Sequence, residues 1–149
     1  MKIKIIGAGF AGLSSAILLS KLDNVEVEIF EKVKPLGAGI VLQPSVINVL
    51  KEMDLLEKTE SFSEKIYKII GKNIKGNEIF STYYNNEHGL AINRISFFDE
   101  MYNKIKSQNI KINLNYEVSN KDIEDFKKSS DLVIIANGSK SILGEDFDF

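Results

Sequence analysis

Residues 2–31 read KIKIIGAGFAGLSSAILLSKLDNVEVEIFE, and this stretch decides the fold. A short β-branched run over residues 3–6 stops at a glycine, and apolar residues then recur with helical spacing over residues 10–18. After a break at Asp23-Asn24, apolar and acidic residues alternate up to Glu31, which predicts a second strand. The stretch therefore predicts a βαβ unit that closes by residue 31.

The turn of this unit carries the spacing G-x-G-x-x-G. In a dinucleotide-binding turn, the first glycine allows a tight exit from the strand, the second lets the backbone approach a pyrophosphate, and the third lets the helix pack closely. The phosphates lie at the helix N-terminus, where free N–H groups and the helix dipole stabilise negative charge. The alternative is a glycine-rich turn without a ligand. The candidate contacts are Gly7, Gly9, Phe10, Ala11 and Gly12.

An acidic residue, Glu31, ends the second predicted strand about 20 residues after the glycine motif, which is the context that favours a nucleotide site. A carboxylate there can accept hydrogen bonds from ribose hydroxyls and would repel the extra phosphate of NADP. The alternative is a solvated acidic residue. The neighbouring Lys32 is also a candidate contact. NAD and FAD proteins share this phosphate-binding chemistry, so the unit alone predicts only a dinucleotide.

The rest of the chain continues as an α/β domain. A proline at the first helical position predicts a helix over about residues 44–56, and a Lys-Gly-Asn turn predicts a hairpin over residues 65–84. A helix is expected after Arg94. Period-two alternation over residues 110–118 predicts a strand, residues 121–128 form a charged connector, and residues 131–136 form a strand covered on both faces. The predicted fold is a Rossmann-type α/β domain with an antiparallel hairpin insertion.

Three further segments carry a family resemblance. They are Gly37–Pro44 (GAGIVLQP), Ile92–Arg94 (INR) with its following helix, and Asp131–Ser141 (DLVIIANGSKS). Together with the glycine motif, and in this order, they resemble the class A flavoprotein monooxygenases, the family of aromatic-ring hydroxylases and ubiquinone-biosynthesis hydroxylases. The resemblance covers nearly the whole chain.

This resemblance implies FAD as the cofactor, NAD(P)H as the electron donor, and a small, often aromatic, substrate. It implies that the loop from Gly37, including Gly39 and Gln43, runs past the flavin and that Arg94 lies over the cofactor. It also implies that Asn137-Gly138 takes part in FAD and NADPH binding. The alternatives are plain loop glycines, a surface arginine, and a core strand whose end binds nothing.

The chain departs from the family pattern in three ways. Asn137 replaces an aspartate, and a basic residue expected after Ser141 is missing around Gly144, which puts NADPH handling in doubt. The substrate domain and the later Gly-Asp motif of the family are not in the sequence. We therefore expect residues 1–149 to be a partial FAD-binding domain. The alternatives are a truncated module without catalysis, one half of a split enzyme with a companion chain, or a small NAD(P)-binding oxidoreductase.

Composition restricts the remaining functions. A net charge of −2 gives no general attraction to nucleic acid, and no apolar run is long enough for a membrane span. Cysteine is absent, so disulfides and thiolate metal sites are excluded, and we expect a cytoplasmic protein. No metal-ligand spacing is present. The single histidine, His88, lies in a polar loop and is expected to be a solvated residue. No catalytic residue is assigned.

Overall fold

The computed structural model describes residues 1–33, 37–138 and 143. The backbone divides into two compact units, residues 1–36 with 98–149 and residues 37–97. Helix α4 (Arg94–Ser107) starts in the second unit and continues into the first. Each unit is described by itself.

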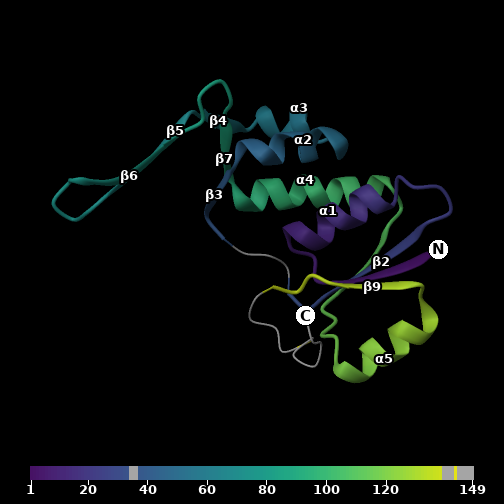
Figure 1. Cartoon of the computed structure of the whole chain (residues 1–149). Coiled ribbons are helices and arrows are strands. Elements are labelled where there is room, and N and C mark those ends of the chain that lie inside the picture. Colours follow the sequence, from purple (N-terminus) through teal and green to yellow (C-terminus); the bar gives the residue numbers. More distant parts are fainter. Residues whose placement is uncertain (34–36, 139–142, 144–149) are drawn as a thin grey trace. The chain divides into compact units, whose positions relative to one another are not determined.

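The first unit is built on a parallel sheet of four strands in the order β8-β2-β1-β9. The strands are β1 (Lys2–Ile6), β2 (Glu26–Glu31), β8 (Lys111–Leu114) and β9 (Leu132–Ile135). Helix α1 (Phe10–Leu19) joins β1 to β2 and covers one face of the sheet, whereas α5 (Asn120–Ser129) covers the other (Figure 1). This arrangement confirms the predicted Rossmann-type α/β fold.

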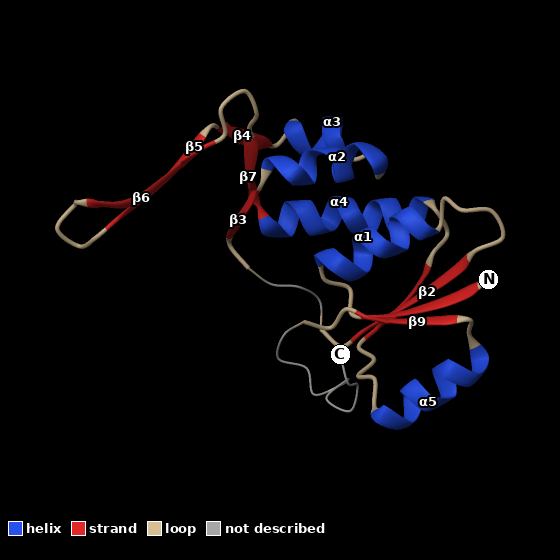
Figure 2. Cartoon of the chain, viewed as in Figure 1, coloured by secondary structure: helices blue, strands red, loops and turns tan. Residues whose placement is uncertain are grey.

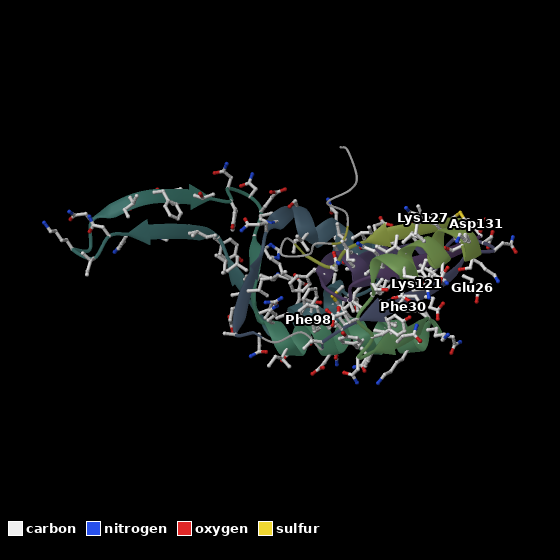
Figure 3. The ribbon with its side chains drawn as sticks, turned by 90° about the horizontal axis from the view of Figure 1, so that it is seen from below. Glu26, Phe30, Phe98, Lys121, Lys127 and Asp131 are labelled. Atoms are coloured by element: carbon white, nitrogen blue, oxygen red, sulfur yellow. The ribbon has the colours of Figure 1, made fainter. Side chains whose placement is uncertain are left out.

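Alternate residues of each strand pack against opposite helix layers. Ile3 and Ile5 are fully buried, and Ile5 lies beside Gly12 of α1. On the other face Ile6 and Phe30 form a core cluster with Val118 and with two residues of α5, Ile123 and Phe126. Figure 3 labels Phe30 in this layer, and the exposed Lys121 and Lys127 of α5 stand at the surface.

Three predictions for this unit are wrong in detail. The strand expected over residues 110–118 ends at Leu114, because Asn115 adopts a left-handed φ of 57°. The segment expected as a connector over residues 121–128 is helix α5, which begins at a capping box formed by Ser119 and Asp122. The strand expected to be covered on both faces is less buried than expected: Leu132 of β9 is 43% exposed, and the other residues of β9 are only partly buried.

The second unit contains two antiparallel sheets. The three-stranded sheet has the order β3-β7-β4, from β3 (Gly39–Leu42), β7 (Gly89–Asn93) and β4 (Ser63–Ile66). The other sheet is the hairpin of β5 (Lys68–Lys72) and β6 (Glu78–Tyr83), which extends away from the other elements of the unit (Figure 2). The predicted hairpin is thus confirmed, except that Ile66 lies in β4 and pairs with β7.

Two helices accompany the three-stranded sheet. Helix α2 (Pro44–Glu52) begins at the expected proline, and α3 (Leu56–Glu60) follows it. The prediction of a single helix up to residue 56 is therefore wrong at its C-terminal end, because α2 ends at Glu52. Asp54 has a φ of 55°, a left-handed conformation that stops an α-helix. Within the described ranges no helix has both the length and the apolar character needed to cross a membrane.

Candidate functional site

The glycine turn after β1 is held by close backbone contacts. Gly7 has a φ of +103°, and its N–H donates to the carbonyl of Phe30 at 2.8 Å. A Cβ at Gly7 would lie 2.4 Å from the carbonyl oxygen of Ala136, and a Cβ at Gly12 would lie 1.9 Å from that of Gly7. Both positions therefore require glycine for the fold itself.

Gly9 differs from the other two glycines. It is the N-cap residue of α1, with an ordinary extended backbone (φ −74°, ψ −173°), and a Cβ there would have no described protein atom within 4 Å. The described residues therefore give no steric reason for a glycine at this position. A pyrophosphate would need space of this kind in front of the backbone in order to approach it closely.

Neither the N-cap residue nor the first turn of α1 offers a side chain that would neutralise the positive end of the helix dipole. Gly9 makes no side-chain cap, and the first turn of α1 contains no acidic residue. The first N–H groups of a helix and its dipole attract negative charge. Ala11 is exposed in this turn. The described part of the helix start therefore has the electrostatic character of an anion site.

Phe10, the other residue of this turn, is fixed by stacking. Its ring lies 4.5 Å from that of Phe98 of α4, at an interplanar angle of 15°. Phe98 is buried. The sequence did not indicate Phe98 as a site residue, because a phenylalanine at helical spacing is typical of a buried core position. The stack anchors the first turn of α1 to α4.

The carboxylate of Glu31 lies directly beside the turn. Its Oε2 accepts a hydrogen bond from the Ala8 N–H at 2.5 Å, and its Oε1 accepts one from the Val33 N–H at 2.9 Å. The next residue, Lys32, pairs with Glu117 at 2.5 Å, and both of these side chains are largely exposed. Thus Glu31 is engaged with the protein backbone, and Lys32 with a surface carboxylate.

The end of β9 also meets the glycine turn. A Cβ at Gly7 would lie 2.7 Å from the Cα of Asn137, so this residue passes next to the turn. Gly138 follows with a φ of +87°, and a Cβ there would have no described atom within 4 Å. The expectations at Ser141 and Gly144 lie outside the described residues. The first unit therefore groups Gly7 to Gly12, Glu31, Lys32 and Asn137-Gly138 at the carboxyl ends of β1, β2 and β9.

The remaining candidates lie together in the second unit. Gly37 has a φ of +148°, and a Cβ there would lie 2.8 Å from Cδ of Arg94 and 3.0 Å from its Nη1. The Arg94 N–H donates to the carbonyl of Ala38 at 2.8 Å, and Gly39 pairs with Asn93 across β3 and β7. The glycine loop and Arg94, which are far apart in the sequence, are therefore neighbours.

Gln43 is held by a residue that the sequence did not single out. Its Oε1 accepts a hydrogen bond from the hydroxyl of Tyr84 at 2.5 Å, and Tyr84 is buried. No sequence motif includes Tyr84, which follows Tyr83 directly after the last strand of the hairpin. The bond orients the Gln43 amide at the start of α2.

His88 lies in a loop, as expected, but its side chain is less solvated than expected. Its side chain is 25% exposed, and Nε2 lies 3.3 Å from a carboxylate oxygen of Glu60, which Lys65 also approaches at 3.3 Å. Partial burial acts to raise the pKa of Glu60, but hydrogen bonds from His88 and Lys65 outweigh it and hold the pKa below its ordinary value. His88 therefore links the last residue of α3, Glu60, to the loop that directly precedes β7.

Comparison with known proteins finds sequences that are similar to part of this chain. A family of NAD(P)-binding Rossmann-like domains matches residues 5–40. An FAD-dependent urate hydroxylase of Mycolicibacterium vanbaalenii is 33% identical over 69 residues, which are 44% of this chain and 17% of the relative. This part of the chain is therefore similar in sequence to FAD-dependent urate hydroxylases. It covers only a small part of the length of this relative.

Solved structures agree on the fold. A tetrameric 2-methyl-3-hydroxypyridine-5-carboxylic acid oxygenase has a TM-score of 0.67 at 23% identity, over 76% of this chain and 31% of that chain. Klebsiella pneumoniae HpxO, solved with FAD and uric acid, has a TM-score of 0.60 at 19% identity, over 77% of this chain and 31% of that chain. These structures confirm the predicted fold, for a chain that spans about a third of their length.

Proposed function

We propose that this chain binds FAD and belongs to a flavin-dependent monooxygenase that acts on a small aromatic substrate. The observation that carries the proposal is Gly9, which lies at an uncapped helix start and where an added Cβ would meet no described atom within 4 Å. Similarity to an FAD-dependent urate hydroxylase and to HpxO solved with FAD supports the choice of FAD over other dinucleotides. We propose residues 1–149 as the FAD-binding domain of such an enzyme.

The residues of the first unit fit the ADP part of FAD. Backbone N–H groups at Gly9, Phe10, Ala11 and Gly12 would bind the pyrophosphate at the start of α1. Carboxylate oxygens have about four lone-pair sites, so Glu31 has acceptor capacity for ribose hydroxyls besides its two backbone bonds. Lys32, Asn137 and Gly138 are proposed as further contacts at the same end of the sheet.

In the second unit, Gly39, Gln43 and Arg94 are the proposed contacts for the flavin ring. The hydrogen bond from Tyr84 orients Gln43, and the close fit of Arg94 against Gly37 restricts the guanidinium. Bound FAD would supply the redox chemistry that passes electrons from NAD(P)H to molecular oxygen, and the protein would supply binding and orientation. We also propose a cytoplasmic location, which the absence of cysteine favours.

A second candidate is a nucleotide-binding module that uses NAD(P)H without a flavin, because the family that matches residues 5–40 binds NAD(P). Calorimetric titration of the purified chain with FAD, NADH and NADPH separates the two functions. We expect FAD to bind most tightly and to co-purify as a yellow protein. Binding of NADH or NADPH without any binding of FAD would refute the main proposal and support the second.

A further inference from the structure

Through its carboxylate and its backbone carbonyl, Glu31 joins three segments of the first unit. Oε2 accepts from the N–H of Ala8, in the middle of the glycine turn, and Oε1 accepts from the N–H of Val33, which follows β2. The backbone carbonyl of Glu31 accepts from Tyr116 at 2.9 Å, just after β8. Glu31 is therefore bonded to the protein on both its side chain and its backbone.

The bond to Ala8 matters for the shape of the turn. Ala8 is fully buried, and a buried backbone N–H without an acceptor costs about 1–3 kcal/mol. The preceding N–H, of Gly7, donates to the carbonyl of Phe30. Two consecutive N–H groups of the turn thus donate to two consecutive residues of β2, the first to a backbone carbonyl and the second to a carboxylate.

We infer that Glu31 is a positioning residue for the phosphate-binding turn, in addition to any contact with a ribose. By holding the Ala8 N–H, its carboxylate fixes the backbone between Gly7 and Gly9 and so presents the start of α1 to the phosphates. Loss of Glu31 then weakens phosphate binding even for a ligand that has no ribose hydroxyls. The inference rests on the proposed nucleotide site.

The test compares two ligands, ADP and 2′,3′-dideoxy-ADP, which differ only in the ribose hydroxyls. Their affinities are measured by calorimetry for the wild-type chain, for Glu31→Ala and for Glu31→Gln. We expect Glu31→Ala to weaken the dideoxy ligand by about tenfold, the size of one charge-assisted hydrogen bond, and ADP by at least this factor. Glu31→Gln retains a carbonyl oxygen for the Ala8 N–H, so it should recover most of the affinity for the dideoxy ligand.

The control is Glu26→Ala, which removes the same charge from an exposed position at the other end of β2 and should leave both affinities unchanged. Amide hydrogen exchange adds a readout without ligand: exchange at Ala8 should be faster in Glu31→Ala than in the wild type. If Glu31→Ala does not fold, the same measurement is made on Glu31→Gln. Exchange at Ala8 should then be somewhat faster than in the wild type, because the neutral amide oxygen is a weaker acceptor than the carboxylate.

Two outcomes would overturn the inference. If Glu31→Ala weakens ADP and leaves the dideoxy ligand unaffected, Glu31 acts through the ribose alone. If exchange at Ala8 is unchanged in both Glu31 variants, the carboxylate does not hold the turn. Failure of the proposed function is distinguishable, since the wild-type chain would then bind neither ADP nor FAD.

Discussion

Gly12 of α1 lies so close to Gly7 that a Cβ on residue 12 would stand 1.9 Å from the carbonyl oxygen of residue 7. The contacted atom belongs to the backbone of the turn, so it cannot rotate away. The first helix of the domain is thus packed on the turn that precedes it, at a distance that only glycine permits.

We therefore expect Gly12→Ala to destabilise the protein by at least about 3 kcal/mol, the upper end of the usual cost of overpacking. Urea denaturation followed by circular dichroism measures the change. Gly9→Ala is the control: Gly9 directly precedes α1, has a φ of −74°, and a Cβ there would meet no described atom within 4 Å. Equal losses in the two variants would show that contact with the backbone of Gly7 does not cause the effect.

Arg94 should depend on the glycine loop for its position. In Gly37→Ala the new Cβ would lie 2.8 Å from Cδ of Arg94, so the guanidinium must move. If Arg94 contacts FAD as proposed, we expect Gly37→Ala to weaken FAD binding by about tenfold, which corresponds to one hydrogen bond to a charged group. The double variant Gly37→Ala/Arg94→Ala should bind no more weakly than Arg94→Ala alone, and an additive loss would rule out this coupling.

Tyr102 predicts a specific alkaline pH dependence. Burial, followed by the negative charges of Glu31 and Asp99, raises the pKa of Tyr102 to about 12. The folded state thus favours the neutral phenol relative to the unfolded state, where the pKa is about 10. The contribution to stability is fully present below pH 10 and is lost as the pH rises towards about 12.

We expect Tyr102→Phe to show a shallower loss of stability over this range than the wild type, as measured by urea denaturation at successive pH values. Tyr83→Phe provides the matched control, because Tyr83 is 60% exposed. Parallel alkaline profiles for the wild type and Tyr102→Phe would contradict the assignment.

The capping box of α5 predicts a simple effect on stability. Ser119 accepts a hydrogen bond from the Asp122 N–H, while the Asp122 carboxylate accepts one from the Ser119 N–H. Ser119→Ala removes the cap and should cost about 1 kcal/mol in the free energy of unfolding. Ser107→Ala, at the exposed C-terminal end of α4, should cost less, and a reversed order would be inconsistent with a stabilising cap.

The sequence predicts the βαβ unit well because three local signals agree there: strand alternation, helical spacing and a glycine turn. It fails at Asn115, where one residue in a left-handed conformation ends β8 although the apolar alternation continues to Val118. It also fails for α5, which has a charged surface and buries only Ile123 and Phe126. Its short apolar stripe is hard to detect among charged residues.

For the candidate site too, the sequence indicates what local spacing marks and misses what depends on tertiary packing. The sequence marks the motif residues by their local spacing, and their roles stay predictions. The resemblance places the Gly37 loop and Arg94 at one cofactor, and the two are neighbours in the structure. The partners Phe98 and Tyr84 were missed, because they meet Phe10 and Gln43 only through tertiary packing. The bond from the Ala8 N–H to Glu31 was missed for the same reason.

The affinity of Gly9→Ala for FAD tests the central claim most directly. A Cβ at this position meets no described protein atom and the backbone is unstrained, so the variant should fold with only the small loss of thermal stability that alanine causes at an N-cap. The new methyl group would occupy the space that the pyrophosphate needs. We predict that the wild-type chain binds FAD and that Gly9→Ala binds it at least about tenfold more weakly, from the usual cost of overpacking. Equal affinities in a folded variant would contradict a pyrophosphate site at this turn.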